Sequence, residues 1–109
     1  MAIQQIIIDT EHSINTQILT LEGDTFKLRF YWNYRESRWY VDFFDTDDNA
    51  IITGLKLTVN YELLNQYIIS NKPNGFLLLF NDKNLDYSKK DDINEDFKLI
   101  YITSDDANI

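Results

Sequence analysis

The stretch from Thr25 to Asp45 limits the possible folds of this chain more than any other stretch. Apolar and polar side chains alternate along both of its halves, a period of two that is typical of β-strands with one buried face. The apolar positions are Phe26, Leu28, Phe30, Trp32, Trp39, Val41 and Phe43. Residues 34–38 between the halves are few and polar, so the stretch predicts a β-hairpin whose two tryptophans, Trp32 and Trp39, face the core.

Shorter β-prone runs flank the predicted hairpin on both sides. They cover residues 3–8, 15–21, 51–59, 76–80 and 97–103. The run at 76–80 is apolar throughout, which predicts a strand covered on both faces. Asn60 can cap a short helix in which Leu64, Tyr67 and Ile68 share a face. The whole pattern predicts an all-β fold: a small antiparallel β-barrel or β-sandwich of about seven strands with at most one short helix.

The segments between these runs have the composition of turns and loops. Residues 45–49 begin like an EF-hand, but Ala50 and Lys56 stand where that motif needs glycine and glutamate, so we interpret the segment as a turn. Gly54 interrupts a strand-like run and predicts a β-bulge. Residues 81–96 are polar and predict a long solvated loop. Its expected anchors are Leu85, Tyr87 and Ile93.

The length and composition predict one β domain over residues 1–109, with 103–109 as a flexible tail. The chain has 109 residues, 44% of them hydrophobic, which is enough to close one core. It contains no cysteine, which excludes disulfides, zinc-thiolate sites and a cysteine nucleophile. No apolar run approaches the ~20 residues that cross a bilayer and no basic leader precedes the first run, so we expect a soluble protein without membrane contact.

The charge of the chain argues against nucleic-acid binding. Eighteen acidic residues outnumber ten basic ones, for a net charge of −8. Proteins that bind DNA or RNA neutralise phosphates with Lys and Arg, so we expect no direct nucleic-acid partner. An acidic balance instead favours solubility, a cationic partner, or a surface to which DNA does not adhere.

No complete catalytic or metal-binding set can be read in the sequence. His12 is the sole histidine, and Ser13 beside it does not make a triad because adjacency in the chain is not geometry. The glycines at 23, 54 and 75 are too far apart for a phosphate-binding loop. We therefore predict no catalytic residues, no cofactor and no metal, with His12 as a surface turn residue.

The candidate interface consists of hairpin residues that alternate with the apolar positions, a set called here the polar parity, together with residues of the predicted turn. Large aromatic side chains on this parity would lie outside the core, where they suit contact with a partner. Arg35 and Arg38 belong to the predicted hairpin loop, where we expect them to be solvent-exposed. The candidate interface residues are Tyr31, Asn33, Tyr34, Arg35, Arg38, Tyr40 and Phe44.

A spaced pattern between Gly23 and Tyr101 resembles the baseplate plug family of cyanophages and other tailed phages. The pattern consists of Thr25-Phe-x-Leu-x-Phe-x-Trp-Asn33, Arg35, Trp39-Tyr-x-Asp42, Gly54-Leu-x-Leu57, Leu63-Leu64, Gly75-x-Leu77 and Leu99-Ile-Tyr101. The resemblance implies a non-catalytic structural protein of the virion, made in the host cytoplasm and built into the contractile-tail baseplate near the tube axis. Its implied partners are baseplate, hub, tail tube or spike proteins and further copies of itself.

Two other functions remain open at the level of sequence. The first is a small acidic inhibitor that imitates the charge of DNA and blocks a nucleic-acid enzyme. The second is a carbohydrate-binding β-sandwich that uses the tyrosine-bearing face of the hairpin.

Overall fold

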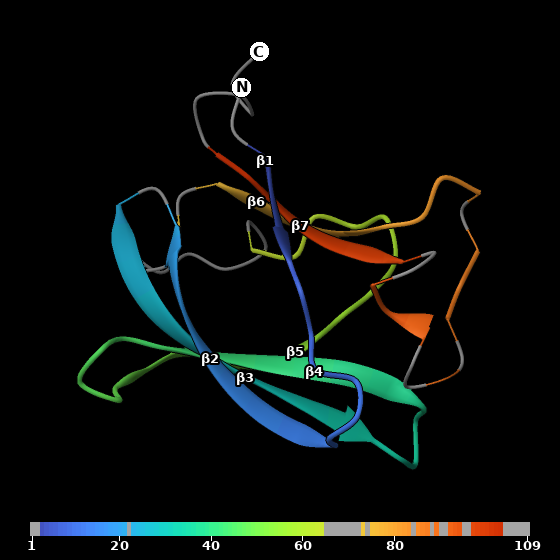
Figure 1. Ribbon diagram of the computed structural model, residues 1–109, viewed down its shortest axis with the longest axis horizontal. Helices are drawn as coiled ribbons and strands as arrows, with labels where there is room; N and C mark the ends of the chain where they lie inside the picture. Colours follow the sequence, from blue (N-terminus) through green and yellow to red (C-terminus); the bar gives the residue numbers. More distant parts are fainter. Residues whose placement is uncertain are drawn as a thin grey trace.

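The computed structural model is an antiparallel β-sandwich of seven strands in two sheets (Figure 1). The strands are β1 (Ile3–Ile6), β2 (Ile14–Leu21), β3 (Asp24–Asn33), β4 (Arg38–Phe44), β5 (Ala50–Lys56), β6 (Phe76–Phe80) and β7 (Lys98–Ile102). One sheet has the order β1-β7-β6 and the other β2-β3-β4-β5, and they do not close into a barrel. The predicted all-β fold is therefore confirmed in its sandwich form.

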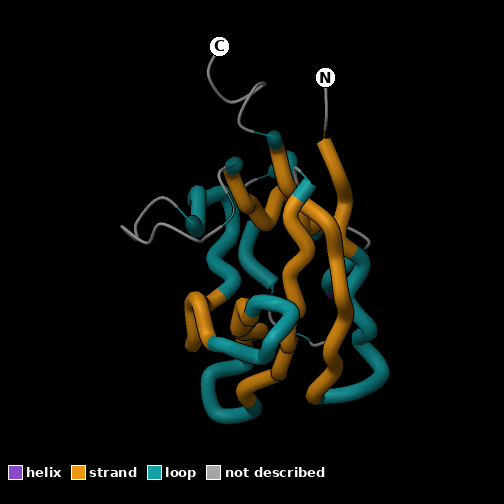
Figure 2. The backbone as a smooth tube through the Cα atoms, turned by 90° about the vertical axis from the view of Figure 1, so that its left-hand side faces the viewer, coloured by secondary structure: helices purple, strands orange, loops and turns teal. Residues whose placement is uncertain are grey.

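The structure describes residues 3–21, 23–64, 73, 75–83, 85–87, 89, 92–94 and 97–103. Figure 2 shows this part of the chain as strands connected by loops, and it contains no α-helix. No helix in it could therefore cross a membrane. The predicted tail beyond Thr103 lies outside the described residues.

The central hairpin has the predicted form. In β3 and β4, Trp32 pairs with Trp39 and Phe30 with Val41, so the apolar positions of both strands share one face. Trp39 is fully buried. Trp32 lies at the margin of the core and is only half-buried, its ring 5.6 Å from that of Trp39. The alternation thus correctly predicted the buried side of the hairpin.

The bulge predicted at Gly54 is present in β5. Val41 pairs with Leu55 and Phe43 with Ile52, so the stretch opposite Asp42 holds an extra residue. Gly54 has φ +70°, a left-handed conformation that disfavours side chains with a Cβ. Its N–H donates to the Asp42 carboxylate at 2.7 Å. The bulge therefore turns a backbone donor toward a side chain of β4.

The segment after β5 follows the edge of β6 and is not helical as far as Leu64, so the helix predicted from Asn60 is wrong over these residues. Asn60 has φ +58° and its amide N–H donates to the Leu79 carbonyl. Its side chain exchanges two hydrogen bonds with the backbone of Asn81, at 2.9 and 3.1 Å. Long-range bonding to β6 therefore replaces the expected cap. Tyr67 and Ile68 lie outside the described residues.

The predicted strand at 76–80 is β6, but it is not covered on both faces. Leu77 and Leu79 are fully buried, whereas Phe76 and Phe80 keep 37% and 43% of their surface exposed. The reason is the architecture: in a two-layer sandwich each sheet has one outer face, and nothing among the described residues lies over this one.

The long connection from β6 to β7 is fixed by buried aromatic and polar contacts. Tyr87 is buried, and its hydroxyl donates to the Leu57 carbonyl at 2.8 Å and accepts from the Trp39 amide at 3.0 Å. Ile93 is also buried. Leu85 is 57% exposed, so its prediction as an anchor is wrong. Tyr87 is buried in place of Leu85 because its hydroxyl forms hydrogen bonds with two buried backbone groups that would otherwise lack a partner.

Candidate interface on the outer face of the four-stranded sheet

The hairpin residues that alternate with the buried ones lie on the outer face of the four-stranded sheet. Together with their partners on β2 and β5 they form rows that run across the strands. One row runs Ile14, Tyr31, Tyr40 and Lys56 from β2 to β5. The rings of Tyr31 and Tyr40 stack with centroids 5.5 Å apart and planes at 12°. As predicted from parity, these tyrosines lie outside the core, where both are half-buried.

The next row is held by an ion pair. Arg29 donates from Nη2 to Oδ2 of Asp42 at 2.7 Å, while Oδ1 of the same carboxylate accepts the Gly54 amide. Asp42 is buried, whereas half of the Arg29 side chain is exposed. The guanidinium also lies 5.3 Å from the ring of Phe44. Burial and two hydrogen bonds therefore fix Asp42, and Asp42 in turn orients the arginine.

The two stacked tyrosines resist ionisation. A hydrogen bond from the Tyr40 hydroxyl to the Glu36 carboxylate raises the pKa of Tyr40 to about 12. Burial, with the nearby Asp42 carboxylate as a smaller cause, raises the pKa of Tyr31 above its ordinary value. Both side chains therefore stay neutral near pH 7.

A shallow hollow of about 220 Å³ lies on the same face. Its lining is Thr16, Lys27, Arg29, Phe44 and Asp48. Lys27 pairs with Asp48 at 2.8 Å across its rim. The hollow thus combines one aromatic ring with two cationic side chains, a composition that suits an acidic or aromatic group of a partner.

The turn of the hairpin presents Tyr34 and Arg35 to solvent. The side-chain oxygen of Asn33 accepts the amides of Arg35 and Glu36, at 3.0 and 3.1 Å, so this residue shapes the turn. Arg35 is exposed, and Tyr34 is 70% exposed with its hydroxyl bonded to Ser13. Asn33 therefore has a structural role, while Tyr34 and Arg35 are accessible.

Arg38 is not the solvent-exposed loop residue that the sequence predicted. It begins β4, and 24% of its side chain is exposed. The guanidinium donates to the Tyr87 carbonyl and to Asp86, and lies 5.1 Å from the Tyr87 ring. Arg38 is partly buried because it contacts Asp86 and Tyr87, which lie 48 and 49 positions further along the chain. No local pattern in the sequence indicates this contact.

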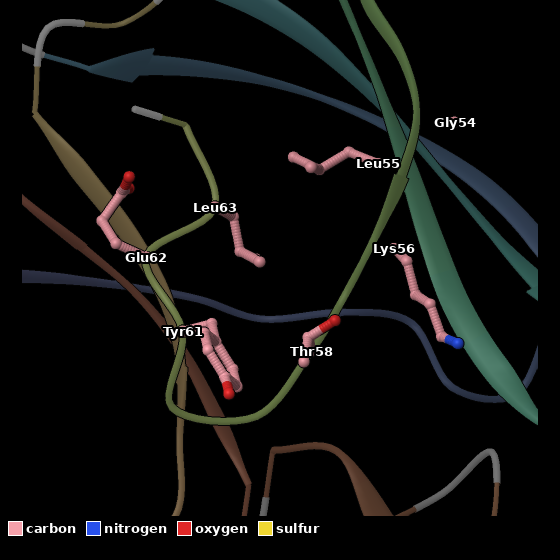
Figure 3. Close-up of a pocket in the computed structure, with 7 residues that line it drawn as sticks. All are labelled: Gly54, Leu55, Lys56, Thr58, Tyr61, Glu62 and Leu63. Carbon is pink, nitrogen blue, oxygen red and sulfur yellow. The ribbon is translucent and has the colours of Figure 1, made fainter. Parts of the chain in front are cut away.

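A second pocket, of about 370 Å³, lies between β5 and the segment that follows it (Figure 3). Its lining is Gly54, Leu55, Lys56, Thr58, Tyr61, Glu62 and Leu63. The side chain of Glu62 is already occupied, because it accepts the amides of Leu64 and Leu77 at 3.0 and 2.9 Å. Tyr61 is largely exposed at the mouth. No sequence pattern pointed to this pocket, which forms only when the segment folds along β6.

The remaining polar candidates have structural roles. His12 is exposed and its Nδ1 lies 2.8 Å from the Asp9 carboxylate, which also accepts the Glu11 amide. These hydrogen bonds hold the pKa of Asp9 below its ordinary value. The Asp45 carboxylate accepts the amides of Asp47 and Asn49, which confirms the turn predicted there. Within the described ranges, no group of three or more His, Cys, Asp or Glu could hold a metal ion.

The fold and this face define a small antiparallel β-sandwich with an aromatic and cationic outer surface. The profile of the family described as "Cyanophage baseplate Pam3 plug gp18" matches residues 3–105. The chain therefore belongs to this phage baseplate plug family, and the resemblance seen in the sequence is confirmed. A comparison with curated proteins found no match. The matched region contains all seven strands, including β1 and β2, which lay outside the sequence pattern.

Proposed function

We propose that this phage baseplate protein is a non-catalytic plug of the contractile tail, seated at or near the tube axis and held by hub, tube or spike proteins. Membership of the plug family carries the proposal. The outer face of the four-stranded sheet and the adjoining hairpin turn are its contact surface, and further copies of the chain are additional neighbours in the assembled tail.

The chemistry of this surface supports the proposal. Tyrosine and arginine are enriched where proteins meet, because they combine a large contact area with directional hydrogen bonds. Arg29 is held by Asp42 and the two stacked tyrosines hold each other, so little side-chain freedom is lost when a partner binds. Tyr34 and Arg35 extend this surface at the turn.

Complementation of a phage that lacks the gene tests the contact surface. The variant Tyr34→Ala with Arg35→Ala removes two exposed side chains, and surface substitutions usually change stability by less than about 0.5 kcal/mol. We expect a nearly unchanged melting temperature but strongly reduced incorporation into purified tails, because truncating an interfacial hot spot can cost about 2 kcal/mol or more.

A matched control removes one exposed apolar and one exposed cationic side chain elsewhere. Leu85→Ala with Lys89→Ala does so in the connection between β6 and β7, and it should be incorporated normally. Normal incorporation of the Tyr34, Arg35 variant would eliminate the hairpin turn as the docking element. Location of the protein away from the tube axis in an electron-microscopy map of the virion would refute the axial position.

The acidity of the chain supports a further part of the proposal. Where the protein faces the tube lumen, its net charge of −8 keeps the passing genome from adhering. We therefore expect no salt-sensitive DNA binding near physiological ionic strength, measured by fluorescence anisotropy with labelled duplex. Binding that weakens steeply with added salt would contradict this role.

The two alternative functions receive no support from the family match. A sugar-binding face also requires free aromatic faces for stacking. The rings of Tyr31 and Tyr40 stack on each other instead, so each offers at most one face.

A further inference from the structure

The outer strand β2 has an edge whose backbone groups have no backbone partner among the residues that the structure describes. In the four-stranded sheet β2 pairs only with β3, along eight residues. The Trp32 amide donates to the Ser13 carbonyl at 2.7 Å, which fixes the phase of this antiparallel ladder. Because hydrogen-bonded and non-bonded pairs alternate, Asn15, Gln17 and Leu19 direct their backbone groups toward β3.

The alternate residues direct their backbone N–H and C=O groups the other way. We call Ile14, Thr16, Ile18 and Thr20 the edge residues. No backbone hydrogen bond of these four to any other strand is found in the described part of the chain. Their side chains are exposed on the outer face, with Ile14 and Ile18 at 67% and 68%. The side chain of Gln17 lies on the other, inward face and donates to the Ile7 carbonyl at 2.8 Å.

This edge lacks the features with which proteins block unwanted strand pairing. Edge strands are commonly short, bulged, covered, or studded with charges and proline. The run from Ile14 to Leu21 contains no charged residue and no proline, and its register with β3 is unbroken. Elsewhere in the molecule β6 is covered by the segment around Asn60, β5 is bulged at Gly54, and β1 has four residues.

Charge decides what kind of strand fits this edge. Exposed carboxylates stand just beyond both of its ends, at Glu11 before β2 and at Asp24 after it. A second copy would bring these acidic ends against each other in either strand direction, within a chain of net charge −8. A strand flanked by lysine or arginine would instead be attracted at both ends.

We propose that the edge of β2 accepts an extended segment of another protein by strand addition, an uncharged β-strand of about eight residues with basic residues beyond its ends. This inference depends on the ladder geometry and the charges around it. It needs neither the virion location nor the tyrosine-bearing face, so its test can fail independently of the proposed function.

The probe is a peptide with an eight-residue alternating Thr/Val core flanked on each side by two lysines; a control peptide carries glutamates instead. Amide hydrogen exchange followed by NMR reports the contact residue by residue. In the free protein the amides of the edge residues should exchange fast while those of Asn15, Gln17 and Leu19 are protected. Addition of the lysine-flanked peptide should slow exchange at the edge residues alone.

Two proline substitutions form a matched pair, one at a residue of β2 whose N–H faces the edge and one at a residue whose N–H faces β3. Thr16→Pro removes an N–H that faces the open edge, which an edge strand tolerates, and should weaken binding of the lysine-flanked peptide about tenfold with the fold retained. Gln17→Pro removes an N–H that donates to β3 and should lower the melting temperature. Full-strength peptide binding by a folded Thr16→Pro protein would overturn the proposal.

A charge exchange tests the same edge without touching the strand. Glu11→Lys with Asp24→Lys should reverse the preference, so that the glutamate-flanked peptide binds more tightly than the lysine-flanked one. An unchanged preference would refute the charge argument, and no binding of either peptide to the wild-type protein would refute strand addition. Concentration-dependent dimers that Thr16→Pro abolishes would assign the edge to a second copy and likewise overturn the proposal.

Discussion

The two outer faces of the sandwich are built on the same alternation but differ in chemistry. On the four-stranded sheet, charged and aromatic side chains are tied to one another, as in the Arg29–Asp42 pair and the Tyr31–Tyr40 stack. On the three-stranded sheet the outward positions are mostly aliphatic or aromatic, with Gln5 and Lys98 as the exceptions. The outward residues are Ile3, Gln5, Phe76, Leu78, Phe80, Lys98, Ile100 and Ile102. The first face is organised by polar contacts before any partner binds, whereas no polar contact among the described residues ties the outward side chains of the second face together.

The contrast shows where the acidity of the chain resides. Of the 18 acidic residues, only Asp24 and Asp42 fall in the described strands, and Asp42 is buried and paired. The negative charge is therefore carried mainly by turns, connections and the C-terminal segment, while the strands themselves contribute few carboxylates to the sheet faces. Faces with few carboxylates can approach other proteins despite the net charge of −8.

The largest expected effect distinguishes the inner from the outer side of β4. Trp39→Ala should open a cavity between the sheets and cost about 3–5 kcal/mol of unfolding free energy, measured by urea denaturation. Tyr40→Ala, one residue later on the outer face, should cost about 1 kcal/mol through loss of the tyrosine stack. Equal losses would show that the tyrosine-bearing face is as much a part of the core as the tryptophan.

A smaller loss of stability is expected from changing Tyr87, which links the β6–β7 connection to β4. Tyr87→Phe leaves the Trp39 amide and the Leu57 carbonyl without their buried partner and should cost about 1–3 kcal/mol. Burial raises the pKa of Tyr87 to about 12, above the ordinary value of 10.0. Since the unfolded chain loses this proton at lower pH, the associated stability is present below pH 10 and lost as pH rises through about 12.

Thermal unfolding as a function of pH measures this loss. Between pH 10 and pH 12 the melting temperature should fall less steeply in Tyr87→Phe than in the wild type. Part of the fall that remains in the variant comes from Tyr40, whose pKa is also about 12. Identical slopes in the two proteins would show that Tyr87 ionises as readily in the folded protein as in the unfolded one.

The polar ties of the four-stranded face can be tested at Asp42. Asp42→Ala should cost about 1–2 kcal/mol, because the Gly54 amide loses its acceptor while the half-exposed Arg29 can turn to water. Lys27→Ala removes the surface pair with Asp48 on the same face and should change stability by less than about 0.5 kcal/mol. A loss as small as that of Lys27→Ala would mean that this face is not organised by its buried carboxylate.

The smallest change in stability sharpens the contrast between the faces. Ile3→Thr with Ile7→Thr replaces isoleucines that are 52% and 58% exposed, and Ile14→Thr with Ile18→Thr is the matched change on β2. Each single substitution should cost less than about 0.5 kcal/mol. Binding of a hydrophobic fluorescent dye should fall more in the first variant, because Ile3 pairs with Ile102 in a row that ends at Phe76. An equal fall in dye binding in both variants would show that the two outer faces do not differ in exposed apolar surface.

Runs of β-prone residues predicted most strands, and alternation predicted the buried side of the central hairpin. The hairpin at 25–45 and the inward side chain of Trp39 were correct, because the direction of a side chain on a strand depends only on its neighbours in sequence. The bulge at Gly54 was also correct, and it followed from a glycine inside a strand-like run. The outward position of Tyr31, Tyr40 and Phe44 followed from the same parity. The family pattern likewise depends on aromatic spacing and turn residues, which are local features.

Tertiary structure decided what the spacing of residues could not. The partial burial of Arg38, the burial of Tyr87 and the loss of the helix at Asn60 arise from hydrogen bonds to residues between 19 and 49 positions away. A polar loop has no hydrophobic period, so nothing in residues 81–96 distinguishes the buried Tyr87 from the exposed Leu85. The edge of β2, which pairs with no second strand in the described part of the chain, and the apolar outer face of β6 also depend on which strands pair. That choice is made by packing two sheets around one core.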